Sequence, residues 1–279
     1  MNMNEQELKL TLSSRLSQKA ARQKQSNRDV KGLATHPDTN SNMIHSVHDD
    51  DQSFVSVTAV NNKLTKSFYE QPCIALAKSL LGKILVRKLE SGEILRGRIV
   101  EAECYLGTID KASHSYMGKR TERNEAMFLH PGTAYVYTIY GVYFCFNISS
   151  LEDGSAVLIR ALEPLQNSSI MCKFRSVKRK NSSVLKEKDL CSGPSKLCQA
   201  LKINKQLNKI DLCTSKVLWL EDGERIPFCN IIECKRIGID SAGEEWANKP
   251  LRFYIQDCIW VSVRNKIAER LQNTDNIQE

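Results

Sequence analysis

Two glutamates separated by one residue, Glu101 and Glu103, interrupt an apolar segment near the middle of the chain. If this segment is a strand, its side chains alternate between two faces, so both carboxylates and Tyr105 lie on one face. A carboxylate that is charged at neutral pH can act as a general base; burial raises its pKa and a nearby arginine lowers it. The segment therefore predicts either a general base or ordinary ion-paired glutamates of an edge strand, and by itself it favours the ion pairs.

A second candidate is Tyr140, which lies with Gly141 between two aromatic, β-prone runs that begin at His130. The runs predict a β-hairpin with Tyr140 at its tip. Because turns usually carry polar residues, an aromatic residue there has two interpretations. It either points outward as a flat wedge that could enter a stack of bases, or it covers the sheet's own core.

A third candidate is the segment Gly193-Pro194-Ser195-Lys196, which predicts the start of a helix. The free N–H groups at a helix N-terminus bind phosphate, and Lys196 adds positive charge. The spacing is not that of a nucleotide-binding P-loop. A phosphate of a nucleic-acid backbone and ordinary helix initiation are equally good explanations.

The elements that would position these residues follow from periodicity and turn residues. We expect a helix between Pro72 and Gly82 and a hairpin formed by strands at 84–89 and 95–105. Further elements are the Tyr140 hairpin, a strand at 155–165, a helix entering an exposed loop at 172–183, a helix after Pro194, and strands at 217–220, 251–255 and 260–263. Strands in series with few intervening helices predict an α+β fold: one mixed domain around a curved antiparallel sheet with a protruding β-hairpin.

Composition divides the chain of 279 residues into three parts. Residues 1–62 contain one aromatic residue, Phe54, out of 19 in the protein, which predicts a disordered polar tail. We expect a folded domain at 63–270 and a flexible C-terminus at 271–279. The tail holds seven basic and seven acidic residues, so the whole net charge of +8 falls on 63–279. This charge suits a polyanionic partner or a merely soluble basic surface.

The ten cysteines form no CxxC pair, and their spacing is not that of a structural zinc site. We therefore expect reduced thiols and no metal or cofactor. The uncharged run 131–151 is long enough to span a bilayer, but its tyrosines, threonines and Gly141 favour strands instead, so no membrane association is predicted.

Five segments between Thr65 and Val263 together resemble the alkyladenine DNA glycosylase family, also called mammalian-type 3-methyladenine DNA glycosylases. They are LRGRIVEAECYLG, GTAYVYTIYGVYFCFNISS, VLIRALEPL, LCSGPSKLCQAL and KPLRFY. The sequence departs from the mammalian pattern at Val142, where methionine is usual, and at Lys119, where arginine is usual.

The resemblance implies a monofunctional glycosylase of base excision repair. It would flip an alkylated or deaminated purine (3-methyladenine, 7-methylguanine, hypoxanthine or ethenoadenine) and hydrolyse its N-glycosidic bond. Glu103 would be the general base, with Arg160 and the main chain near Ile239 helping to hold the attacking water. The base pocket would be formed by Tyr105, His114, Tyr137, Asn147 and Leu158, with Asn147 excluding normal guanine and Tyr140 filling the gap in the DNA.

The implied DNA-backbone contacts are Lys119, Arg120, Arg123, Ser195, Lys196, Lys249 and Arg252. The expected partner is double-stranded DNA with damaged purines, bound by a monomer in the nucleus, with the mitochondrion as a second compartment. The basic cluster 178–180 could be a nuclear signal, although a solvated loop is the favoured interpretation. The alternatives are a non-catalytic nucleic-acid-binding module and a polysaccharide hydrolase that uses Glu101 and Glu103 as an acid/base pair.

Overall fold

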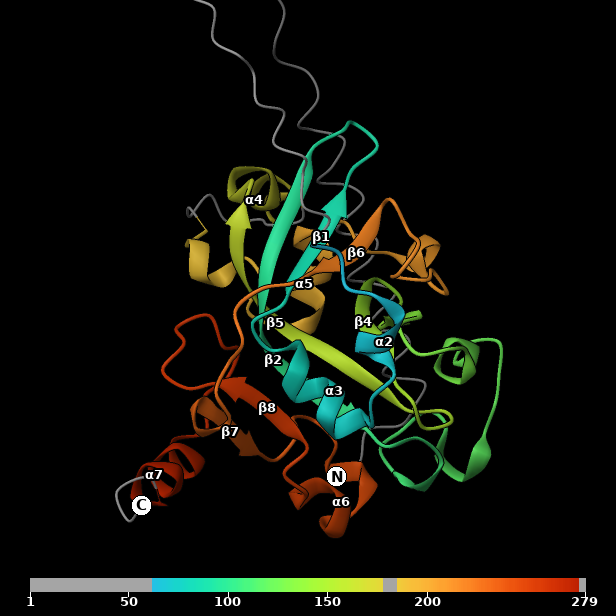
Figure 1. Cartoon of the computed structure of the whole chain (residues 1–279), viewed down its shortest axis with the longest axis vertical. Coiled ribbons are helices and arrows are strands. Elements are labelled where there is room, and N and C mark those ends of the chain that lie inside the picture. Colours follow the sequence, from blue (N-terminus) through green and yellow to red (C-terminus); the bar gives the residue numbers. More distant parts are fainter. Residues whose placement is uncertain (1–61, 178–184, 276–279) are drawn as a thin grey trace, which may run out of the picture. The chain divides into compact units, whose positions relative to one another are not determined.

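The computed structural model describes residues 62–177 and 185–275 (Figure 1). The predicted tail lies outside these ranges except for its last residue, and the basic cluster 178–180 lies outside them as well. The described helices are α2 (Lys66–Tyr69), α3 (Cys73–Leu80), α4 (Ser168–Ser176), α5 (Pro194–Ala200), α6 (Glu244–Asn248) and α7 (Lys266–Asp275). The strands are β1 (Ile84–Lys88), β2 (Ile94–Tyr105), β3 (Ala134–Ile139), β4 (Tyr143–Ser149), β5 (Ala156–Gln166), β6 (Leu218–Glu221), β7 (Ile231–Cys234) and β8 (Arg252–Ile255).

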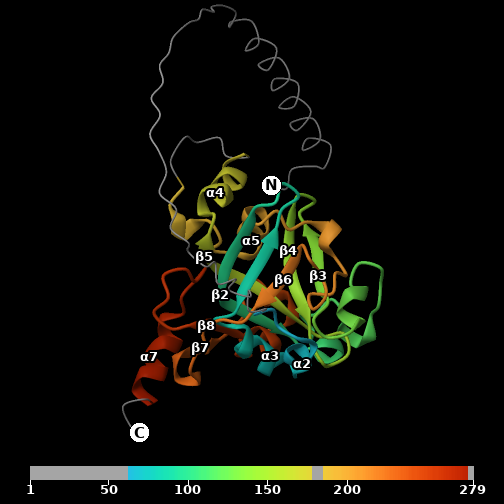
Figure 2. The same cartoon turned by 45° about the horizontal axis from the view of Figure 1, so that its top comes forward.

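The strands form one curved, antiparallel sheet in the order β3-β4-β5-β2-β1-β6, to which β8 adds by pairing with β2 and β7 by pairing with β8. Figures 1 and 2 show the helices placed around this sheet, with α3 beside β2 and α7 beside β7. The predicted α+β fold around a curved antiparallel sheet is confirmed, and so is the hairpin, which is formed by β3 and β4.

The long strand β2 lies at the centre of the sheet. Along one edge it pairs with β5. Along the other edge its first half pairs with β1 and its second half, Glu101 to Glu103, pairs with β8. The two glutamates are therefore on an interior strand, which excludes the edge-strand interpretation.

The main core fills one side of the sheet, where α3 contributes Leu76 and Leu80 and α5 contributes Leu197 and Ala200. Gly82 ends α3, as predicted, with φ of +87°. A Cβ there would lie 2.2 Å from the carbonyl oxygen of Glu224, so this position requires glycine both for its backbone conformation and for space.

The predicted element order is wrong or incomplete in several places. The segment 260–263 is a turn and loop instead of a strand, because the N–H of Ser262 donates to the carboxylate of Glu101 instead of a neighbouring strand. Strand β7, only four residues long, was missed because its short apolar run has no clear period. Helices α2, α6 and α7 were not predicted either, and α7 runs to Asp275.

In the described ranges no helix combines the length and the apolar composition needed to cross a bilayer. The uncharged run 131–151 instead forms the β3–β4 hairpin. All ten cysteines are free thiols.

Candidate active site

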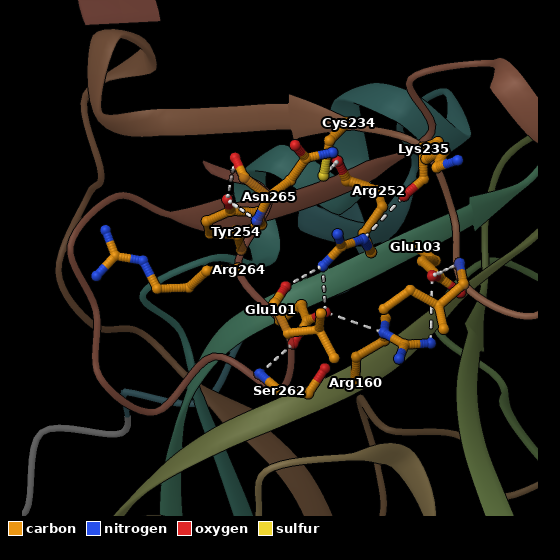
Figure 3. A network of polar contacts seen from close by, with 12 residues as sticks. Glu101, Glu103, Arg160, Cys234, Lys235, Arg252, Tyr254, Ser262, Arg264 and Asn265 are labelled. Atoms are coloured by element: carbon orange, nitrogen blue, oxygen red, sulfur yellow. Dashed lines mark hydrogen bonds and ion pairs between the residues drawn. The ribbon is translucent and has the colours of Figure 1, made fainter. Parts of the chain in front are cut away.

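The two carboxylates of β2 lie on the same face, as the strand period predicts, and both contact one guanidinium. Arg160 on β5 donates from Nε to Glu101 at 3.0 Å, and its Nη1 lies 3.2 Å from Oε1 of Glu103 (Figure 3). Neither glutamate has exposed surface. Because Arg160 lies between the two carboxylates and contacts both, they have no space between them for a sugar, which excludes the acid/base pair of a polysaccharide hydrolase.

Glu103 is held by two hydrogen bonds and one ion pair. The backbone N–H of Ile237 donates to it at 2.9 Å and the hydroxyl of Tyr105 at 3.1 Å, while Nη1 of Arg160 forms the ion pair. Burial raises the pKa of Glu103, and Arg160 and the Ile237 N–H oppose this rise only in part. A raised pKa makes a carboxylate a stronger base in its charged form, provided that the form is populated at working pH.

A cavity of about 440 Å³ opens beside this cluster. All five predicted base-pocket residues and Arg160 line it: Tyr105, His114, Tyr137, Asn147 and Leu158. Glu103 lies directly behind the wall, because the three residues that hold it, Arg160, Ile237 and Tyr105, all line the cavity. A water in the cavity can reach Glu103 only if one of these contacts, such as the Tyr105 hydroxyl, gives way.

One wall of the cavity is aromatic. The ring of His114 meets that of Tyr137 edge to face at a centroid distance of 4.7 Å, and Tyr137 lies 5.2 Å from Tyr135. Nδ1 of His114 is hydrogen-bonded to the Tyr135 hydroxyl at 2.8 Å. Such flat, polarisable surfaces suit a planar heterocycle, and they also attract a cationic one.

His114 is neutral at physiological pH. Loss of hydration around the ring lowers its pKa to about 4, and the positive charges of Arg123 and Lys119 act in the same direction. A neutral imidazole with Nδ1 engaged by a hydroxyl has Nε2 free to make one further hydrogen bond to a bound group.

Comparison with known proteins decides which family this architecture represents. A profile of the methylpurine-DNA glycosylase (MPG) family matches residues 67–259. The chain belongs to the methylpurine-DNA glycosylase family. It is 52% identical to the human DNA-3-methyladenine glycosylase over 211 residues, 75% of this chain and 70% of the human one. Identity to the mouse DNA-3-methyladenine glycosylase is 49% over 215 residues, 76% of this chain and 64% of the mouse one.

A bacterial relative, the putative 3-methyladenine DNA glycosylase of Clostridium botulinum, is 51% identical over 205 residues, which are 72% of this chain and 100% of the bacterial one. Membership makes this protein a DNA glycosylase, a hydrolase that acts on DNA. Within the glycosylase the matched segment 67–259 contains every predicted site residue.

The hairpin tip of this glycosylase presents Tyr140 to solvent with 90% of its surface exposed, which excludes the alternative that Tyr140 covers the core. Its φ is +49° and that of Gly141 is +71°, the left-handed pair of a type I′ turn. A left-handed conformation costs a non-glycine residue about 1–2 kcal/mol. A tyrosine at this position exposes its ring to solvent and adopts an unfavourable backbone conformation. The stability of the fold therefore does not explain why the residue is a tyrosine.

Replacing Tyr140 with asparagine should separate folding from function. Asn-Gly is the preferred type I′ pair, so we expect the melting temperature to stay level or rise by a few degrees. Release of a damaged base under single-turnover conditions should fall about tenfold or more, because nothing then fills the gap left in the stack. An unchanged release rate with the stabilised turn would contradict the wedge.

The residues predicted to contact the DNA backbone differ in how exposed they are. Lys119, Arg120 and Arg123 are exposed; Arg123 lies over the Tyr137 ring at 5.4 Å from its centre, and Arg120 lies over the Phe128 ring. Ser195 and Lys196 occupy the first turn of α5, next to Pro194, which lines the cavity. Lys249 is half-buried over the Trp246 ring and paired with Glu245 at 3.0 Å.

Arg252 does not fit the prediction that it contacts DNA. Its side chain is buried, and its guanidinium donates to Glu101 at 2.9 Å and to the carbonyl oxygens of Lys235 and Val263. The register of β8 against β2 turns Arg252 toward the glutamates. It is therefore an internal counter-ion and is not available to a phosphate.

Sequence reasoning missed three parts of the site. Tyr135 was recoverable, because it lies two residues before Tyr137 on the same strand. The ion pair of Arg236 with Asp110, at 2.5 Å, is buried behind Tyr105, and Arg236 lies 4.8 Å from the centre of that ring. The Ile237 contact uses a backbone N–H, for which residue type gives no signal.

Proposed function

We propose that this protein is a monofunctional DNA glycosylase of base excision repair that acts on alkylated and deaminated purines. The substrates are 3-methyladenine, 7-methylguanine, hypoxanthine and ethenoadenine in double-stranded DNA, bound by a monomer in the nucleus. The observation that carries the proposal is the position of Glu103: a buried carboxylate held by two hydrogen bonds and an ion pair, behind the wall of a cavity lined by tyrosines.

In the proposed reaction a water molecule attacks the anomeric carbon of the flipped nucleotide, the bond to the base breaks, and Glu103 accepts a proton from the water. The Tyr105 hydroxyl moves off Glu103 to admit this water, while Arg160 keeps the carboxylate charged. An alkylated purine is already cationic, takes the bonding electrons as a neutral base and leaves readily, whereas hypoxanthine or ethenoadenine takes them as an anion that is protonated from solvent. The protein must therefore mainly place the water and hold the base between aromatic rings.

Selectivity has two proposed sources. Flipping costs a few kcal/mol and is easiest at damaged or mispaired positions. Inside the pocket, the side-chain amide of Asn147 is buried and donates to the carbonyl oxygen of Tyr135 at 3.0 Å, so it is fixed in place. A fixed group can exclude the exocyclic amino group of normal guanine, which an adaptable one could not.

The experiment that tests the function is incubation with duplexes that carry a single 3-methyladenine, hypoxanthine or 1,N6-ethenoadenine, followed by alkali. We expect the enzyme to release the damaged base and the strand to be cleaved only after alkali is added. An undamaged duplex should release no base. A duplex that is bound but never depurinated would instead support the non-catalytic binding module.

The monofunctional part of the proposal needs its own control, because Lys111 also lines the cavity. A lysine that attacked the sugar would form an imine that borohydride traps as a covalent protein–DNA adduct. We expect no adduct and no strand cleavage before alkali, and an adduct that Lys111→Ala abolishes would overturn this part.

A further inference from the structure

We propose that Glu101 is the positioning residue of this site, which fixes the guanidinium of Arg160 so that Arg160 reaches Glu103. This inference rests on the proposed function, in which Glu103 is the base. Glu101 itself does not line the cavity, so it would act only through Arg160.

The first support is that different nitrogens of the Arg160 guanidinium contact the two glutamates. Nε donates to Oε1 of Glu101 at 3.0 Å, while Nη1 lies 3.2 Å from Oε1 of Glu103 (Figure 3). The guanidinium is planar and its donors are in a fixed fork, so holding Nε in place fixes the direction of Nη1. Although burial acts to lower it, the pKa of Arg160 is raised by the two carboxylates, and the side chain stays charged.

The second support is that both carboxylate oxygens of Glu101 accept hydrogen bonds from other parts of the chain. Its Oε1 accepts from Nη1 of Arg252 at 2.9 Å, and its Oε2 accepts from the backbone N–H of Ser262 at 2.7 Å. Arg252 is fixed in turn by the carbonyl oxygens of Lys235, at 2.9 Å, and Val263, at 2.7 Å. Glu101 therefore connects Arg160 to β8 and to the loop that follows it.

The third support is an irregularity in the strand pairing. Ile99 pairs with Leu162 and Ala102 pairs with Ile159 in one common register, but between them Glu101 pairs with Ala161, which leaves both Val100 and Arg160 unpaired. The common register, continued through this irregularity, puts Arg160 opposite Glu101, and residues opposite each other on neighbouring strands lie on the same face. Arg160 therefore lies on the side of the sheet that carries Glu101 and Glu103.

A purely stabilising role explains this arrangement poorly. Buried ion pairs add little to stability compared with well-packed apolar groups, because desolvation offsets the attraction. Two interior carboxylates with two guanidiniums instead define a direction for each side chain. The charged or titratable groups near Glu103 come from five parts of the chain: Glu101 and Tyr105 of β2, Cys145 of β4, Arg160 of β5, Cys234 of β7 with the following Arg236, and Arg252 of β8.

The test is Glu101→Gln in the full chain. Glutamine has one acceptor oxygen instead of two, so it cannot accept hydrogen bonds from the two arginines and also from the Ser262 N–H. The negative charge that holds Arg160 is lost as well. We expect single-turnover base release from an ethenoadenine duplex to fall about 10- to 100-fold, as for loss of one charge-assisted hydrogen bond. Affinity for the same duplex should stay within about twofold, since Glu101 is remote from the DNA.

The matched control is Glu163→Gln. Glu163 pairs with Arg98 at 2.6 Å across the same strands, β5 and β2, but it lies outside the cavity. This control should change neither rate nor affinity. Adding Glu101→Gln to Arg160→Gln should slow the enzyme no further, because Glu101 would act only through Arg160.

A soluble Glu101→Gln protein with a normal single-turnover rate, or with additive effects in the double variant, would overturn the proposal. If Glu101→Gln does not fold, Glu101→Asp keeps the charge and shortens the reach, and a normal rate in that variant would overturn it equally. Glu103→Gln distinguishes a failure of the proposed function from a failure of the positioning role of Glu101. Full activity in that variant refutes the proposed function, whereas an inactive Glu103→Gln beside a fully active Glu101→Gln refutes the positioning role alone.

Discussion

Glu103→Gln is expected to lower the single-turnover rate of base release by about 10³-fold, within the range for loss of a general base. Glutamine fits the existing contacts. Its carbonyl oxygen can accept from the Ile237 N–H and lie beside Arg160, as Oε1 does now, and its amide nitrogen can donate to the Tyr105 hydroxyl, which is able to accept. The variant should therefore fold and bind damaged DNA while lacking a group that can take the proton from water.

The measurement is a single-turnover time course with excess enzyme, together with the dissociation constant for the same ethenoadenine duplex and the melting temperature. Binding within about threefold of the unchanged protein and a similar melting temperature would show that only the chemical step is lost. If the variant instead released base at the normal rate, Glu103 would not be the base, and a non-catalytic role for the cluster would have to be considered.

Arg160→Gln is expected to have the second largest effect, on both activity and stability. It removes the charge that most strongly opposes the rise in the pKa of Glu103, and it leaves two buried carboxylates with less compensation. Breaking a buried ion pair in this way costs about 3–5 kcal/mol of stability. Single-turnover release at neutral pH should fall at least about 100-fold, since the base loses both its orientation and part of its charged population.

The pH dependence of base release should change in a defined direction in Arg160→Gln. Glu103 acts only when it is deprotonated, so the rate falls as the pH drops through its pKa in the folded protein. Burial already raises that pKa above the usual value, and without Arg160 it rises further. The acid limb of the rate profile should therefore move to higher pH in Arg160→Gln.

Arg98→Gln is the matched control, because Arg98 pairs with Glu163 between the same two strands and away from the cavity. It should leave the acid limb in place. An Arg160→Gln enzyme that is slow at all pH values, with no shift of the limb, would assign Arg160 to holding the water rather than to the charge state of Glu103.

Much of the fold followed from local signals. Pro72 and Gly82 delimit α3, and the aromatic runs around Gly141 form the predicted hairpin. These elements could be predicted because capping, turn conformation and period-two alternation depend on residues a few positions apart. The strand predicted at 260–263 failed because the backbone there is fixed by a side chain more than 150 residues away, Glu101, through the Ser262 N–H.

The features of the site likewise divide into those that local sequence could predict and those that depend on distant contacts. By itself the sequence determined that Glu101, Glu103 and Tyr105 share a face and that Tyr140 lies at a turn, because both depend on strand period and turn position. Only the tertiary structure decided that Arg252 is buried against Glu101 rather than exposed to DNA, and that Ile237 supplies a backbone donor to Glu103. The partner of a buried charge depends on the register of β2, β5 and β8 against one another, and residue types along the chain do not encode this register locally.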